Sequence, residues 1–136
     1  MTDQALIRLA FEAREYAYAP YSGFAVGAAL LCGDGTAYTG CNVENAAYPV
    51  GLCAERTALA KAVSEGKRGF VRIAICGGRA GEDAAEYCAP CGMCRQALAE
   101  FCGGDFEILL PAKGRETRRF VLRQLLPEAF GPQNLS

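Results

Sequence analysis

Residues 24–43, FAVGAALLCGDGTAYTGCNV, contain the pattern that decides the fold. Residues 24–32 carry no charged side chain, and an apolar run of this length is typical of a buried strand. Residues 33–35, Gly-Asp-Gly, are of the types that favour a tight turn. We therefore expect residues 36–43 to return beside the first run as the second strand of a hairpin.

Helical and strand patterns alternate on either side of this hairpin. Apolar residues with helical spacing in the first segment are Leu6, Leu9, Ala10, Ala13 and Ala17. They predict a helix over residues 2–18, which Pro20 ends. Further helices are expected at 53–65 and 91–102, further strands at 70–76, 106–110 and 118–122, with a short helix at 121–126 as the alternative for the last part. The alternation predicts an α/β protein, a three-layer α/β/α sandwich with a five-stranded mixed sheet, in one domain spanning residues 1–136.

Composition excludes several classes of partner. The net charge is −1 and the isoelectric point is about 5.5, so no general positive field attracts nucleic acid. The one basic run, Arg115, Arg118 and Arg119, is interpreted as a solvated strand face, with a phosphate-binding patch as the alternative. The N-terminus lacks the features of a signal peptide, and the longest apolar run is too short to span a membrane. We expect a cytoplasmic protein that binds neither nucleic acid nor membranes.

Two short segments together have the composition of a zinc site in a chain that contains no histidine. Cys91 and Cys94 lie three residues apart, so they share one face of a helix and have metal-ligand spacing. Cys53 supplies a third thiolate, and Glu55 follows it by two residues. Three ligands with an open fourth position are typical of catalytic zinc, and a carboxylate that does not bind the metal can move protons. We predict one Zn²⁺ per chain on the three cysteines, with Glu55 as the catalytic residue.

The spacing of the first segment also predicts its local geometry. Residues two apart lie roughly 200° apart around a regular helix, so Cys53 and Glu55 cannot converge if both are helical. Cys53 is therefore expected just before the helix, and Glu55 in its first turn. Arg56, three residues after Cys53, is expected to donate to its sulfur and offset the negative charge of three thiolates. Arg95 is the second candidate for that role, and a solvated Arg56 is the alternative interpretation.

Cys88 leaves a second interpretation open. Cys88, Cys91 and Cys94 are equally spaced, and with Cys53 they would form a closed four-thiolate site in a non-catalytic zinc module. Pro90 places Cys88 in a loop outside the helical face, which favours the open site. A redox role for the Cys-x-x-Cys motif is disfavoured, because the flanking segments do not predict a thioredoxin-like order of strands. The cysteines interpreted as plain core residues are Cys32, Cys41, Cys76 and Cys102.

The Cys-x-Glu and Pro-Cys-x-x-Cys pair is the signature of zinc nucleobase deaminases. Other segments extend the match, in order along the chain: FAVGAAL at 24–30, GCNVENAAY at 40–48, CAERTA at 53–58, PCGMCRQ at 90–96 and LLPEAF at 125–130. Together they resemble the small homotetrameric zinc-dependent cytidine deaminases over nearly the whole chain. The resemblance implies hydrolytic deamination of cytidine and 2′-deoxycytidine to the uridine forms and ammonia, in pyrimidine salvage.

The resemblance also implies roles for residues outside the metal site. Asn42 and Glu44 would hold the ribose hydroxyls, and Phe24 and Ala54 would contact the substrate. Phe130 would reach into the site of a neighbouring subunit of a homotetramer. From the residues alone, Asn42 and Glu44 are ordinary loop residues and Phe130 is a buried aromatic.

A deaminase of a cytosine-containing antibiotic is the other enzymatic interpretation. A Glu44 that binds a ribose favours a nucleoside instead. The chain departs from the family pattern at residues 81–86, GEDAAE, which lengthen the segment before the second motif, and at Cys88.

Overall fold

The structure is a computed structural model that describes residues 1–136. Its helices are α1 (Asp3–Arg14), α2 (Ala54–Ser64), α3 (Gly92–Phe101) and α4 (Leu122–Leu125), with short 3₁₀ helices η1 (Tyr48–Val50) and η2 (Pro132–Asn134). Its strands are β1 (Phe24–Cys32), β2 (Ala37–Cys41), β3 (Phe70–Arg79), β4 (Glu107–Leu110) and β5 (Arg118–Val121).

The predicted hairpin is present, with β1 and β2 antiparallel and Gly27 opposite Cys41. The second strand ends at Cys41, two residues before the predicted end. The Asn42 N–H still donates to the Val26 carbonyl at 3.3 Å, but the bond from the Val26 N–H goes to the Asn42 side chain. Its Oδ1 accepts from the Val26 N–H at 2.9 Å, and its Nδ2 donates to the Phe24 carbonyl at 2.7 Å. The start of β1 is therefore held by an amide side chain at the edge of the sheet.

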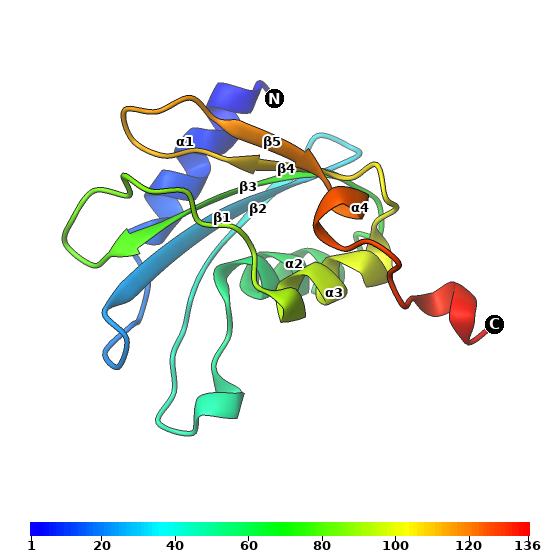
Figure 1. Ribbon diagram of the computed structural model, residues 1–136, viewed down its shortest axis with the longest axis horizontal. Coiled ribbons are helices and arrows are strands. Elements are labelled where there is room, and N and C mark those ends of the chain that lie inside the picture. The colour runs from blue at the N-terminus through cyan, green and yellow to red at the C-terminus, as the bar shows by residue number, and fades with distance from the viewer.

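The five strands form one mixed sheet in the order β2-β1-β3-β4-β5. Only the β3–β4 pair is parallel, because α3 provides the crossover between these strands. Helix α1 covers one face of the sheet, while α2 and α3 lie side by side over the other (Figure 1). The predicted α/β/α sandwich with a five-stranded mixed sheet is confirmed.

Alternate residues of β1 pack into two separate cores. Ala28 and Leu30 belong to the core beneath α2 and α3, whereas Ala29 and Leu31 belong to the core beneath α1. The first strand of the hairpin is thus buried on both faces, as its apolar sequence predicts. Gly40 allows α2 to lie directly on β2, because a Cβ at this position would be 2.5 Å from backbone atoms of Ala54 and Ala58.

The structure corrects several predicted bounds of helices and strands, and the predicted burial of two cysteines. Helix α1 ends at Arg14 and not at residue 18, since the Tyr18 N–H pairs with the Asn42 carbonyl at 2.9 Å. Strand β5 and helix α4 divide residues 118–125, which combines the two alternatives considered for that stretch. Cys32 and Cys76 are buried as predicted, but Cys41 and Cys102 are only half-buried. No helix has the length and apolar character needed to cross a membrane.

Candidate metal centre and substrate pocket

Three cysteine sulfurs converge where α2 and α3 begin. The Sγ atoms of Cys53 and Cys91 are 3.8 Å apart, those of Cys91 and Cys94 are 3.5 Å apart, and all three lie within 4.8 Å of one another. A tetrahedral zinc ion with bonds of about 2.3 Å requires sulfur atoms roughly 3.8 Å apart. The spacing and the all-thiol donor set therefore fit zinc.

Two of these cysteines lie at helix N-caps. Cys53 has φ −76° and ψ 155°, an extended conformation directly before α2, which is the position predicted for it. Cys91 has φ −67° and ψ 167° and precedes α3, so the prediction that it lies inside the helix is wrong by one residue. Only Cys94 is helical, and it is fully buried. Helix N-termini favour negative charge, which suits sulfurs that must lose their protons to bind a metal.

The three thiols perturb one another's pKa values. Hydrogen bonding with Cys94 lowers the pKa of Cys53, and the Arg56 guanidinium adds to this effect. The same Cys53–Cys94 interaction, together with burial, raises the pKa of Cys94. A cation bound among the sulfurs would stabilise their ionised forms.

Arg56 makes the predicted contact with the metal site. Its Nη2 lies 3.9 Å from Cys53 Sγ and 3.2 Å from the Gly51 carbonyl, while its buried Nε has no partner. Arg95, the second candidate, donates instead to the carbonyls of Pro90 and Leu125, both at 2.7 Å. Arg95 thus holds the segment before α3, and Arg56 is the cation beside the sulfurs.

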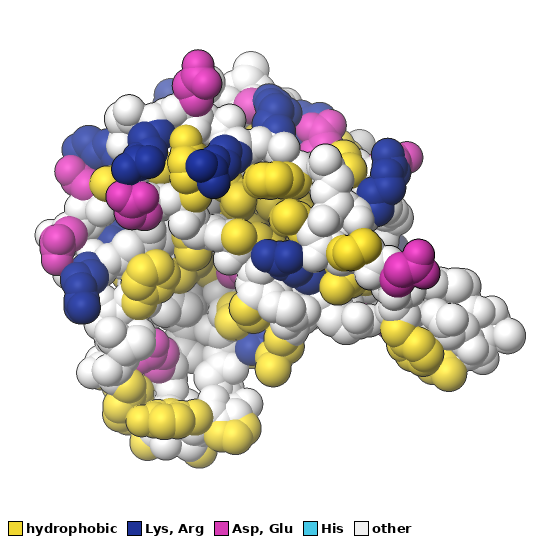
Figure 2. All heavy atoms as spheres, in the orientation of Figure 1, with side chains coloured by type: hydrophobic (Ala, Val, Ile, Leu, Met, Phe, Trp, Pro, Cys, Tyr) yellow, Lys and Arg dark blue, Asp and Glu magenta, His cyan; other side chains and the backbone are white.

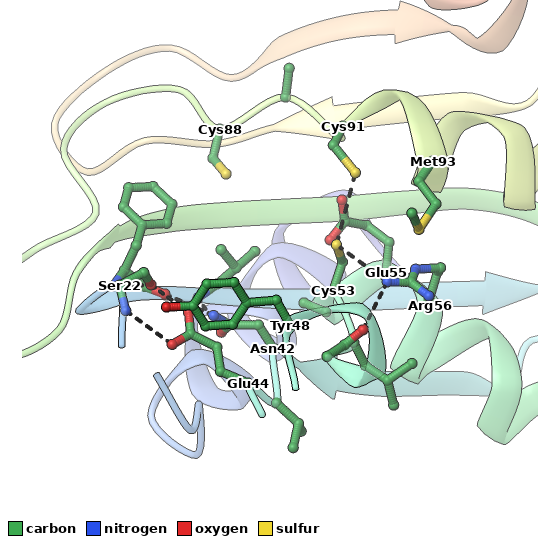
Figure 3. A pocket seen from close by; sticks show the side chains of 17 residues that line it. Ser22, Asn42, Glu44, Tyr48, Cys53, Glu55, Arg56, Cys88, Cys91 and Met93 are labelled. Atoms are coloured by element: carbon green, nitrogen blue, oxygen red, sulfur yellow. Dashed lines mark hydrogen bonds between the residues drawn. The ribbon is translucent and has the colours of Figure 1, made fainter. Parts of the chain in front are cut away.

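Glu55 lies in the first turn of α2 and is only 5 % exposed. Its carboxyl group points into the same part of the pocket as Cys53 and Cys91 (Figure 3). Burial raises the pKa of this carboxyl group, with the charge on Cys53 as a further cause. A raised pKa suits a group that must accept and release a proton near neutral pH.

A cavity of about 500 Å³ lies beside the sulfurs, within the usual range for small-molecule pockets. The residues with predicted roles that line it are Phe24, Asn42, Glu44, Cys53, Ala54, Glu55, Arg56 and Cys91. Phe130 lies elsewhere, on the C-terminal segment, and is 58 % exposed. The expectation of a buried Phe130 from the residues alone is therefore wrong.

Glu44 is held firmly at the mouth of the cavity. One carboxylate oxygen accepts from the N–H groups of Tyr21 and Ser22, each at 3.0 Å, and the other accepts from the Ser22 hydroxyl. These hydrogen bonds, the hydroxyl first, lower the pKa of Glu44. The group is an ionised acceptor, and Figure 3 shows it on the same side of the pocket as Asn42.

Several residues without a predicted role also line the cavity, among them Ser22, Tyr48 and Met93. These residues lie in loops or at the start of a helix, where hydrophobic periodicity does not indicate which side chains line a pocket. The only local signal is the Ser22-Gly23 pair next to β1, which is typical of a turn.

Cys88 does not complete a four-thiolate site. Its sulfur is not among those within 4.8 Å of one another, and it lines another part of the cavity wall. Burial raises the pKa of Cys88 to about 12. The fourth corner of the cysteine cluster is therefore not closed by a cysteine.

Known proteins are similar to this chain over most or all of its length. A sequence model described as the cytidine and deoxycytidylate deaminase zinc-binding region matches residues 1–109. A cytidine deaminase of Sporosarcina psychrophila is 46% identical over 136 residues, covering 100% of this chain and 96% of that protein. A cytidine deaminase of Mycobacterium tuberculosis H37Rv is 41% identical over 126 residues, or 93% of this chain and 87% of the relative.

Solved structures agree with the sequence relatives. The crystal structure of cytidine deaminase from Burkholderia pseudomallei superposes with a TM-score of 0.86 at 47% identity, covering 96% of this chain and 100% of that one. That of Mycobacterium tuberculosis superposes with a TM-score of 0.77 at 41% identity, covering 96% and 99%. With the three-sulfur cluster and the buried carboxyl group beside it, these matches show that the chain belongs to the cytidine and deoxycytidylate deaminase family.

Proposed function

We propose that this protein catalyses the zinc-dependent hydrolytic deamination of cytidine and 2′-deoxycytidine to uridine and 2′-deoxyuridine, with release of ammonia, in pyrimidine salvage. The observation that carries the proposal is a group of three converging sulfurs, open at one corner, beside a buried carboxyl group in a cavity of about 500 Å³. One zinc ion per chain would be held by Cys53, Cys91 and Cys94. When bound there, zinc supplies Lewis-acid activation of water at neutral pH.

Glu55 performs the proton transfers. It accepts a proton from the attacking water and delivers it to N3 of the pyrimidine as the new C–O bond forms at C4. It then takes the remaining proton from the new hydroxyl group on C4 and gives it to the exocyclic nitrogen. The C4–N bond breaks as the C4=O double bond forms, and ammonia leaves. The burial that raises the pKa of Glu55 supports both transfers. The Arg56 guanidinium offsets part of the negative charge of the three sulfurs.

Asn42 and Glu44 bind the sugar. Glu44 is an ionised acceptor held in place by Ser22, so it suits a ribose hydroxyl as donor. Phe24 provides an apolar surface beside it. Ala54 is the first residue of α2, where the backbone N–H has no partner within the helix and can donate to the base.

The active form is a homotetramer with sites shared between subunits. Two segments project from the sandwich, the loop between β2 and α2 and the C-terminal tail, and apolar side chains gather on both (Figure 2). The large exposed apolar residues there are Val43, Tyr48, Val50, Leu52, Phe130 and Leu135. Exposed apolar patches of this kind mark interaction sites, and the exposure of Phe130 supports its proposed contact with a neighbouring subunit. We place the protein in the cytoplasm.

Two measurements on the purified protein test the proposal: zinc per chain, and loss of cytidine absorbance with release of ammonia. We expect one zinc and turnover of both cytidine and 2′-deoxycytidine. A tightly bound zinc without turnover of any cytosine nucleoside would refute the enzyme assignment. Faster turnover of a cytosine-containing antibiotic than of cytidine would refute the substrate assignment.

A further inference from the structure

Two loops of opposite charge meet beside the pocket. The segment at 80–90 joins β3 to α3, the segment at 111–117 joins β4 to β5, and both lie at the same end of the sheet (Figure 1). Lys113 Nζ lies 3.1 Å from Asp83 Oδ2, and Arg115 Nη2 lies 2.9 Å from Glu86 Oε1. All four side chains are largely exposed, so each pair alone contributes little.

Tyr87 is the centre of this contact. The guanidinium carbon of Arg118 lies 4.0 Å from the centroid of the Tyr87 ring, and that of Arg115 lies 5.8 Å from it. The Tyr87 hydroxyl donates to the Glu116 carbonyl at 2.7 Å. Arg118 forms no ion pair with a carboxylate, so the ring is its main partner. We call Tyr87, Arg115, Arg118 and the Glu116 carbonyl the Tyr87 clasp.

This contact accounts for the basic run at the start of β5. Arg118 and Arg115 face Tyr87, whereas Arg119 pairs with Asp3 and Glu107 on the other face of the sheet. The run is exposed, as the solvated strand face predicts, and its side chains also have specific partners on the two faces of the sheet.

The residues directly after Tyr87 form a wall of the substrate pocket. Cys88 and Ala89 both line the cavity. A Cβ at Gly77 on β3 would lie 2.7 Å from Cys88 Sγ and 3.0 Å from the Phe24 ring, so only glycine leaves room for both side chains. Cys88 and Phe24 thus both pack over Gly77 of β3, and Cys88 is one residue from the clasp.

The metal-ligand end of the same loop is held separately. Pro90 is fully buried, and Arg95 donates to its carbonyl at 2.7 Å. A second bond from Arg95 to the Leu125 carbonyl fixes the guanidinium itself. Loss of the clasp would therefore loosen Cys88 and Ala89 while Cys91 keeps its place.

We propose that Tyr87 is a positioning residue: the clasp holds Cys88 and Ala89 against Phe24 and so sets the wall of the pocket that binds the nucleoside. This proposal rests on the proposed function for its substrate. It predicts an effect on substrate affinity without an effect on the proton transfers or on metal content.

The test compares Tyr87→Leu with Tyr87→Phe in the zinc-loaded full chain. Leucine removes the ring, and we expect KM for cytidine to rise about tenfold, equivalent to about 1.4 kcal/mol, with kcat within about twofold and zinc content unchanged. Phenylalanine keeps the aromatic face and loses only the hydroxyl bond, so KM is expected within about threefold of the parent. Arg118→Gln, at an exposed position, should raise KM in the same direction by about threefold.

Hydrogen–deuterium exchange gives a second readout that does not need turnover. Residues 84–90 should exchange faster in Tyr87→Leu than in Tyr87→Phe, while the amides of α3 stay protected. Unchanged KM and unchanged exchange in Tyr87→Leu would overturn the proposal, as would a loss of zinc in parallel with activity. An unmodified chain that does not deaminate cytidine would refute the proposed function, and the exchange measurement would still decide on the clasp.

Discussion

Replacing Glu55 with glutamine removes the proposed proton carrier and changes little else. The two side chains have the same shape, and the site is only 5 % exposed, so the amide occupies the same volume. The other acidic residue of the pocket, Glu44, accepts hydrogen bonds from Tyr21 and Ser22, and these bonds lower its pKa. Glu44 therefore cannot replace Glu55 in proton transfer. Proton transfer by a positioned side chain contributes typically 10²–10⁴-fold to the rate, and in the proposed mechanism Glu55 serves both N3 and the leaving amine. We therefore expect kcat to fall by about 10⁴-fold, equivalent to roughly 5.5 kcal/mol.

The assay combines steady-state cytidine absorbance with zinc content and thermal unfolding. Glu55→Gln should retain one zinc per chain and a thermal midpoint no lower than that of the parent, because a neutral amide is easier to bury than a carboxylate. Glu12→Gln, an exposed position on α1, is the matched control and should keep full activity. A kcat within tenfold of the parent, with zinc retained, would refute the role of Glu55.

Three further predictions test the surroundings of the site. Arg56→Gln should weaken zinc binding by about 10–100-fold in competition with a chelator, since it removes the cation beside Cys53. Gly40→Ala should lower the free energy of unfolding by about 1–3 kcal/mol in denaturant titrations and reduce activity, because the added Cβ would lie 2.5 Å from backbone atoms of α2. Burial raises the pKa of Cys76 to about 11 and that of Cys102 to about 12, whereas the unfolded thiols ionise near 9.0. The contribution of the fully buried Cys76 thiol to the free energy of unfolding should therefore be fully present below pH 9.0 and fall as the pH rises towards 11, by up to about 1.4 kcal/mol per pH unit. Cys76→Ala should show a smaller fall over this range.

The parts of the fold that are encoded locally could be predicted from the sequence. The apolar run and the turn residues within 24–43 indicate the hairpin, and helix geometry alone predicts that Cys53 lies just before α2. The extension of α1 to residue 18 was wrong because the end of that segment pairs with Asn42, which is distant in sequence. Local spacing contains no information about such a partner.

The same limit applies to the pocket and the clasp. Ser22 and Tyr48 enter the pocket from separate loops, and Tyr87 meets Arg118 only because β5 returns beside β4. The basic run was interpreted from its own charge, although its partner is an aromatic ring thirty-one residues upstream. Phe130 is predicted to be buried from its apolar character alone but is exposed. The sequence does not show whether the rest of the subunit covers an apolar residue.

The two anchors of the segment at 80–90 explain why its length need not disturb the metal centre. Arg95 holds the Pro90 carbonyl from within α3, so the sulfurs keep their spacing whatever precedes this residue. The Tyr87 clasp holds the other end against β5, where a longer or shorter loop can be accommodated in solvent. Between these anchors only Cys88 and Ala89 contact the cavity, so changes in this loop alter the pocket wall and leave the chemistry at the sulfurs intact.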